Sequence, residues 1–144
     1  MPRLFVGNGT GSEINLRKTG KKLTLQSWGI APKIRDIDDA LQIGSKKWAF
    51  EVHPELCFRE MNRQNLLRYS KRKEAGRFER TQLLTPYFPG IRQHLANRES
   101  GVGADDLLNA AAAAWTAIRH YQGKAESVGA ACVDERGLPM RIYF

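Results

Sequence analysis

Glu51 stands inside an otherwise apolar stretch, and its possible chemistry depends on whether its carboxylate is buried. Trp48, Phe50 and Val52 alternate with more polar residues, which predicts a strand that carries Glu51 and His53 on its second face. A buried carboxylate needs a cation or hydrogen bonds, because desolvation penalises its charge. A strand with one solvated face explains the same alternation without a ligand, and this is the interpretation we favour.

A pair of acids opens the segment ADDLLNA at 104–110. At helical spacing, Asp105, Asp106 and Asn109 share a face opposite the apolar residues of the segment. Acids in a first turn also complement the helix dipole and cap free N–H groups, which explains Asp105 without a ligand. For Asp106 the capping and ligand roles both stay open.

These carboxylates together could hold a divalent cation. A strand carboxylate and an acid pair at the start of an Ala-rich helix supply the oxygen ligands that Mg²⁺ or Mn²⁺ prefers. The predicted metal ligands are Glu51, Asp105 and Asp106, of which Glu51 and Asp106 are the predicted catalytic residues. Such a metal would activate water, so we expect Glu51 to lie near the start of this helix, closer to Asp106 than to Asp105.

A basic segment at 59–80 lies between the two groups of acids. It contains eight Lys and Arg residues and three Glu, a local net charge of +5. The whole chain has 23 Lys and Arg against 15 Asp and Glu, a net charge of +8, which favours polyanionic partners such as nucleic acid. The predicted nucleic-acid-binding residues are Lys71, Arg72, Lys73, Arg77 and Arg80.

Other catalytic designs have less support in this sequence. It contains no GxSxG nucleophile elbow and no HExxH zinc motif. We expect His94 and His120 to be surface residues, whereas His53 remains open. Cys57 and Cys132 are far apart and without a CxxC partner, so we expect packed, reduced thiols.

The first half of the chain is expected to begin with a flexible lead-in at 1–14, which contains the Gly-rich stretch GNGTG. This stretch lacks the spacing of a phosphate-binding P-loop. Near-helical apolar spacing from Leu23 to Leu41 predicts two short helices that Pro32 separates. A strand from Trp48 to Val52 precedes a short helix that Pro54 opens.

The second half is expected to contain a helix at 72–84, a Pro-punctuated loop and a long helix at 104–121. Five consecutive alanines give the long helix high propensity, and Gly123 ends it. The tail predicts two short strands joined by a turn at 135–139.

Length and composition limit the class of protein. A chain of 144 residues with 42% hydrophobic and 26% charged residues is typical of one globular domain. It contains no apolar run of roughly 18 residues and no secretory signal pattern, so we expect a cytoplasmic protein without a membrane span.

Five segments of the chain resemble one family. They are TGKKLTLQSWGIAPKIRDIDDAL, FEVHPELCFREMN, SKRKEAGRFERTQLL, GADDLLNAAAAAWTAIR and GLPMRIYF. Over residues 15–144 they look like the C-terminal part of the domain of unknown function 429 family, whose members are regarded as predicted nucleases with a ribonuclease H-like fold.

The resemblance implies a three-layer α/β ribonuclease H-like domain that hydrolyses nucleic-acid phosphodiesters with a divalent metal. Glu51 takes the strand position of the family's metal site, and Asp106 takes the first helix position. Ser70, Lys71, Gly76 and Arg80 fall in a family pattern of SK, G and R without an assigned role.

Two features differ from the family pattern. Similar sequences read DDxLDA at the helix start, so Asn109 offers a neutral amide where an anionic ligand is expected. The family also opens with a strand that carries an Asp in a D-G context, and nothing before Glu51 resembles that strand.

These differences shape our expectations about pairing and activity. The first strand of the family lies beside the strand at 48–52, which would otherwise expose unpaired backbone groups. We therefore expect that strand to pair with the lead-in, a second copy or a partner chain. With too few acids to hold two ions, we expect low or undetectable turnover. The alternative function is a non-catalytic module that binds nucleic acid or another protein.

Overall fold

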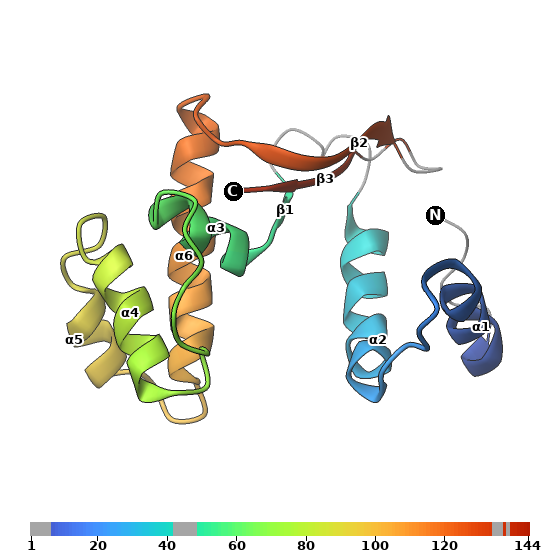
Figure 1. Ribbon diagram of the computed structural model, residues 1–144, viewed down its shortest axis with the longest axis horizontal. Coiled ribbons are helices and arrows are strands. Elements are labelled where there is room, and N and C mark those ends of the chain that lie inside the picture. Colours follow the sequence, from blue (N-terminus) through green and yellow to red (C-terminus); the bar gives the residue numbers. More distant parts are fainter. Residues whose placement is uncertain (1–6, 42–48, 134–136, 138) are drawn as a thin grey trace. The chain divides into compact units, whose positions relative to one another are not determined.

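The computed structural model describes residues 7–41, 49–133, 137 and 139–144 (Figure 1). Its described residues form helices and a small three-stranded sheet, a mixed α/β architecture. The chain divides into two compact units, one of residues 1–49 and 131–140 and one of residues 50–130 and 141–144. Within the described residues no helix is long and apolar enough to cross a membrane.

The first unit contains helices α1 (Gly7–Thr19) and α2 (Leu25–Ala40). The prediction of a flexible lead-in at 1–14 is wrong from Gly7 onward, because the Gly-rich stretch lies within α1. Residues 1–6 lie outside the described part. The Thr24 hydroxyl accepts a hydrogen bond from the Ser27 N–H at 3.1 Å and so caps α2.

A single α2 replaces the two short helices predicted from 23 to 41. Pro32 lies inside it, where its ring removes one backbone donor without ending the helix. The helix ends at Ala40, and the N–H of Leu41 still donates to the carbonyl of Ile37 at 2.9 Å. A proline is therefore a weaker stop signal here than the sequence pattern suggests.

The second unit gathers four helices around a common core. These are α3 (Pro54–Met61), α4 (Glu74–Leu84), α5 (Ile91–Ala96) and α6 (Ala104–Tyr121). Helices α3 and α4 both pack against α6 (Figure 1). The predictions for α3, α4 and α6 are confirmed, including Pro54 in the first turn of α3. Helix α5 has only six residues, which is too short for an apolar periodicity to predict it from the sequence.

The core of this unit is apolar and centres on α6. Its buried residues are Cys57, Phe58, Leu84, Ile91, Leu108, Ala112, Trp115 and Phe144. The small side chain of Ala112 is fully buried, which lets α6 approach its neighbours closely. Trp115 meets Tyr87 edge-on at 5.7 Å between ring centroids, and the Arg119 guanidinium lies 4.5 Å above its indole ring.

Cys57 is a free, buried thiol, as predicted. Burial raises the pKa of the Cys57 thiol, because the thiolate would lose its solvation. The Thr116 hydroxyl donates to Sγ at 3.1 Å, and the thiol donates to the carbonyl of His53 at 3.3 Å. Cys57 is therefore part of the packing between α3 and α6. The side chain of Cys132 lies outside the described residues.

The sheet has the order β1-β3-β2, with β1 at Glu51–Val52, β2 at Ser127–Val133 and β3 at Pro139–Tyr143. Strands β1 and β3 are parallel, with Glu51 opposite Ile142. Reciprocal backbone hydrogen bonds join Glu126 and Phe144, the pattern of an antiparallel pair.

This sheet confirms the two C-terminal strands and bears on two further predictions. Strand β1 begins at Glu51, and Trp48 lies outside the described residues, as does most of the turn predicted at 135–139. Within the described residues β1 pairs with β3 of its own chain and not with the lead-in. Because β1 is an edge strand of this sheet, pairing of its other side with a second copy or a partner chain stays a prediction. A parallel pair needs a long crossover, here through four helices, and local sequence patterns carry no signal of it.

Candidate nucleic-acid interface

The basic loop 68–73 lies along the first turns of α4 and is held there by four α4 residues, Gly76, Arg77, Glu79 and Arg80. Glu79 accepts hydrogen bonds from two consecutive backbone N–H groups, that of Arg68 at 3.0 Å and that of Tyr69 at 3.2 Å. These are charge-assisted bonds, which are stronger than those between neutral groups. Among the described residues, Glu79 is the only acid whose side chain hydrogen-bonds to the loop backbone. These bonds fix the conformation of the loop.

Gly76 and Arg80 complete this attachment from the same face of α4. A Cβ atom on Gly76 would overlap the carbonyl oxygen of Ser70, so only glycine allows the loop to lie this close. One turn later, Arg80 donates from Nη1 to the carbonyls of Tyr69 at 3.2 Å and Gly76 at 3.0 Å. Three residues of the pattern noted in the sequence, Ser70, Gly76 and Arg80, therefore have a structural explanation, whereas Lys71 is exposed.

Arg80 is 4% exposed, and its second terminal nitrogen donates to the Glu55 carboxylate at 2.8 Å. The prediction that Arg80 binds nucleic acid is wrong, because its guanidinium faces protein groups on α3 and in the loop. Its position one turn after Gly76 and one turn before Leu84 places it on the buried face of α4. That spacing is the signal in the sequence that could have identified it as a structural residue.

The remaining predicted cations divide into two groups. Lys71, Arg72 and Lys73 are exposed. Arg77 is half-buried, and its Nη1 donates to the carbonyl of Arg72 at 3.2 Å, which adds a further restraint on the loop. The structure therefore presents Lys71, Arg72 and Lys73 as exposed cations on a loop of fixed backbone and places Arg77 and Arg80 in its support.

The acids of the predicted metal site do not gather in one place. Glu51 is exposed, which agrees with a strand that has one solvated face. The neighbouring Phe50 ring stacks on His120 in the last turn of α6, with 4.3 Å between ring centroids. Asp106 lies in the first turn of α6, about 21 Å from His120 along the helix axis at 1.5 Å per residue. The strand that carries Glu51 thus meets α6 at the end opposite the acid pair.

Asp105 and Asp106 converge on each other at the start of α6. One carboxylate oxygen of each lies 2.8 Å from the point where a Cβ on Gly103 would stand. Neither side chain caps the helix by a hydrogen bond, although both are in its first turn. The described residues contain no group of three His, Cys, Asp or Glu that could hold a metal ion. The residues present therefore do not fit the Mg²⁺ or Mn²⁺ site that the sequence predicted.

The histidines lie in separate environments. His120 is half-buried between Phe50 and Tyr143, whose ring centroids are 4.3 and 5.0 Å from its own, so its prediction as a surface residue is wrong. The pairing of β1 with β3 places both aromatic rings there. His94 is exposed, as predicted, and His53 precedes α3 as an exposed residue.

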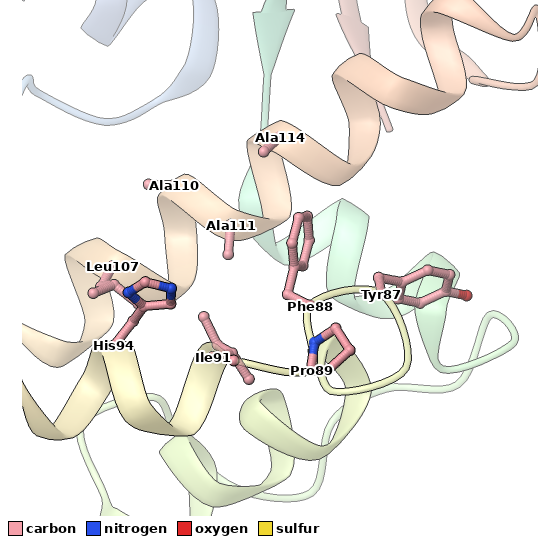
Figure 2. Close-up of a pocket in the computed structure, with 10 residues that line it drawn as sticks. Tyr87, Phe88, Pro89, Ile91, His94, Leu107, Ala110, Ala111 and Ala114 are labelled. Carbon is pink, nitrogen blue, oxygen red and sulfur yellow. The ribbon is translucent and has the colours of Figure 1, made fainter.

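An apolar cavity of about 520 Å³ lies between the α4–α5 connection, α5 and α6 (Figure 2). The alanines of α6 form one wall of it, opposite Phe88 and Ile91 (Figure 2). Its lining contains the imidazole of His94 but none of the predicted metal ligands or nucleic-acid-binding cations. The cavity is therefore separate from the chemistry that the sequence suggested.

Comparison with known proteins identifies the family and nothing more specific. A family model described as "Protein of unknown function (DUF429)" matches residues 7–132. No curated protein and no solved structure matches the chain. Since the matched region covers most of the sequence, as the resemblance implied, the chain belongs to the DUF429 family.

Proposed function

We propose that this protein binds nucleic acid through the basic loop 68–73. The observation that carries the proposal is the presentation of Lys71, Arg72 and Lys73 on a backbone that α4 already holds in place. Because the loop is already ordered, binding of phosphates by its cations costs little conformational entropy. Phosphate contacts supply most of the non-specific affinity of proteins for nucleic acid.

The balance of charge around the loop supports a polyanionic partner. Residues 68–73 include four cations and no acid. Glu79 is engaged with the loop backbone, and Glu55 is paired with Arg80 at 2.8 Å. These two acids are therefore partly neutralised by contacts inside the protein, and the four cations of the loop outnumber Glu74, the exposed acid that follows Lys73.

Simultaneous replacement of Lys71, Arg72 and Lys73 by alanine tests the proposal. We expect this variant to bind labelled oligonucleotides more weakly, with a smaller dependence on salt. Each lost phosphate contact lowers the slope of log K against log salt by about 0.7 to 0.9, so the loss of all three should lower it by about two. Fluorescence anisotropy over a salt series measures both quantities.

The matched control replaces Lys18, Lys21 and Lys22 by alanine. These lysines are also exposed, and their loss lowers the net charge of +8 by the same three units. We expect the control to change the slope by less than about 0.5. Equal effects of the two variants would mean that the basic charge acts diffusely, and the loop would not be the binding site.

Metal-dependent hydrolysis of phosphodiesters on a ribonuclease H-like fold is the second candidate function. Family membership and the parallel pairing of β1 with β3 support the fold proposal. The convergence of Asp105 and Asp106 is the observation that favours the activity. The distance of β1 from that end of α6 speaks against it, because a pair of ions needs several carboxylates within reach.

We expect purified protein to show weak Mg²⁺ binding and low or undetectable cleavage of RNA and DNA. Two carboxylates with a neutral Asn109 beside them supply too little charge to clamp two ions. For the same reason, Asn109→Asp alone should not create activity. Cleavage is measured with and without EDTA, and robust Mg²⁺-dependent turnover that Glu51→Gln abolishes would contradict this expectation and favour the enzyme.

A further inference from the structure

We propose that the loop 68–73 selects single-stranded nucleic acid, with the Tyr69 ring stacking on an unpaired base. This inference rests on the proposed function and adds a preference between nucleic-acid forms. Aromatic rings that accept a base face are the usual partners of basic side chains in single-strand binding. In a duplex the base faces are already stacked on one another, so such a ring gains nothing there.

The backbone of Tyr69 is fixed from both sides. Its N–H donates to Glu79 at 3.2 Å, and its carbonyl accepts from Arg80 at 3.2 Å. The same carbonyl oxygen lies 2.9 Å from the point where a Cβ on Gly76 would stand. Both polar groups of this residue are therefore bonded to α4, and the direction in which its side chain leaves the loop is set before any ligand arrives.

The side chain of Tyr69, in contrast, has no bonded partner among the described residues. Tyr69 is 49% exposed, and among the described residues its ring has no aromatic or cation partner. Single exposed aromatic residues are common on protein surfaces. Tyr69 differs from them because both polar groups of its main chain are bonded to α4 while its side chain is partly exposed, which lowers the entropy that stacking would cost.

Cations flank Tyr69 along the chain on both sides. Arg68 precedes it, and Lys71 and Arg72 follow it, all of them exposed. A base that stacks on the Tyr69 ring carries a phosphate on each side, and these cations are the groups available to neutralise those phosphates. The arrangement of cation, ring and cations on one loop is what a single strand requires.

Phe78 provides a matched control. It is 60% exposed and belongs to the same helix that holds the loop. It follows Gly76 by two residues, which places it about 200° around the helix axis, on the side away from the loop. Its ring is as available to solvent as that of Tyr69 but cannot join the loop cations in binding one strand.

The test measures binding of labelled oligo(dT), oligo(U) and a DNA duplex of equal length to the full chain. We expect Tyr69→Ala to weaken binding of both single strands by about 10-fold, the size of a lost base–aromatic stack. Duplex binding should stay within about twofold of the wild type, because its phosphate contacts remain. Tyr69→Phe keeps the ring and should retain single-strand binding, and Phe78→Ala should leave all three affinities within about twofold.

Two results would overturn the inference in distinguishable ways. If the wild-type chain binds and Tyr69→Ala leaves single-strand affinity unchanged, or weakens duplex binding equally, stacking by Tyr69 is wrong and the proposed function stands. If the wild-type chain binds none of the probes, the proposed function fails and this inference fails with it. Circular dichroism of each variant verifies that the fold is intact, and Tyr69→Phe, which removes only an exposed hydroxyl, keeps the test decisive.

Discussion

Replacing Arg80 by alanine is expected to lower the free energy of unfolding by about 3 kcal/mol, the lower end of the range for a broken buried ion pair. The lower end applies because the Glu55 side chain is 38% exposed, whereas that of Arg80 is 5% exposed. The substitution removes the partner of Glu55 Oε2 and of two backbone carbonyls, and it removes the guanidinium that lies 5.4 Å above the Phe58 ring. Urea unfolding followed by circular dichroism measures the loss.

Arg72→Ala is the matched control for this prediction. This variant removes an exposed arginine of the loop 68–73 and leaves the α4 residues that hold the loop unchanged. The free energy of unfolding should therefore change by no more than about 0.5 kcal/mol. Because the loop depends on Arg80, we also expect Arg80→Ala to weaken nucleic-acid binding although Arg80 touches no ligand. An Arg80→Ala protein as stable as the wild type would show that the ion pair with Glu55 and the loop contacts contribute nothing to folding.

Replacing Trp115 by alanine is expected to cost about 3–5 kcal/mol, the usual loss for a large aromatic residue in a core. Trp115 is 4% exposed and packs edge-on against Tyr87. It also supports Arg119, which donates to the carbonyl of Lys124 at 2.9 Å just after the end of α6. The substitution therefore opens a cavity and loosens the C-terminal end of the central helix. A loss of this size is a large fraction of the stability of an ordinary domain.

Tyr121→Ala separates this effect from the general loss of an aromatic residue on α6. Tyr121 is 93% exposed, so we expect a change within about 0.5 kcal/mol. Urea denaturation midpoints of the two variants, compared at equal slope, give the difference. Similar midpoints for Trp115→Ala and Tyr121→Ala would mean that the core around α6 is not the main source of stability.

Local signals predicted α3, α4 and α6, three of the four helices of the second unit. The alanine run and Gly123 define α6, and the early proline defines the start of α3. These features act through backbone propensity and capping, which depend on neighbours in sequence. They were sufficient to place Asp105 and Asp106 in a first turn, where the structure has them.

Long-range contacts were beyond the reach of such signals. The position of Glu51 relative to Asp106 depends on the pairing of β1 with β3 and on which end of α6 that pair meets. Periodicity fixes which residues share a face, but it does not fix where along a helix another element packs. The acids of the predicted metal site lie apart for that reason, although each acid was assigned to the correct kind of element.

The basic segment shows a second limit of sequence reasoning. Arg80 and Arg72 are equivalent by charge and composition, yet one is buried and the other is exposed. Arg80 is buried because the loop approaches α4 closely where Ser70 lies against Gly76, and the face of α4 that carries Gly76 is thereby covered. A count of charges therefore overestimates the number of cations available to a ligand.

The attachment of the loop 68–73 to α4 also separates two kinds of evolutionary constraint. Gly76, Glu79 and Arg80 determine the path of the loop, and they act on its backbone rather than on its side chains. The outward residues Lys71 and Arg72 contribute little to that path, so they are free to change without loss of the fold. Relatives that keep the three supporting residues could therefore present different side chains on the same loop, and ligand preference could diverge while the scaffold stays constant.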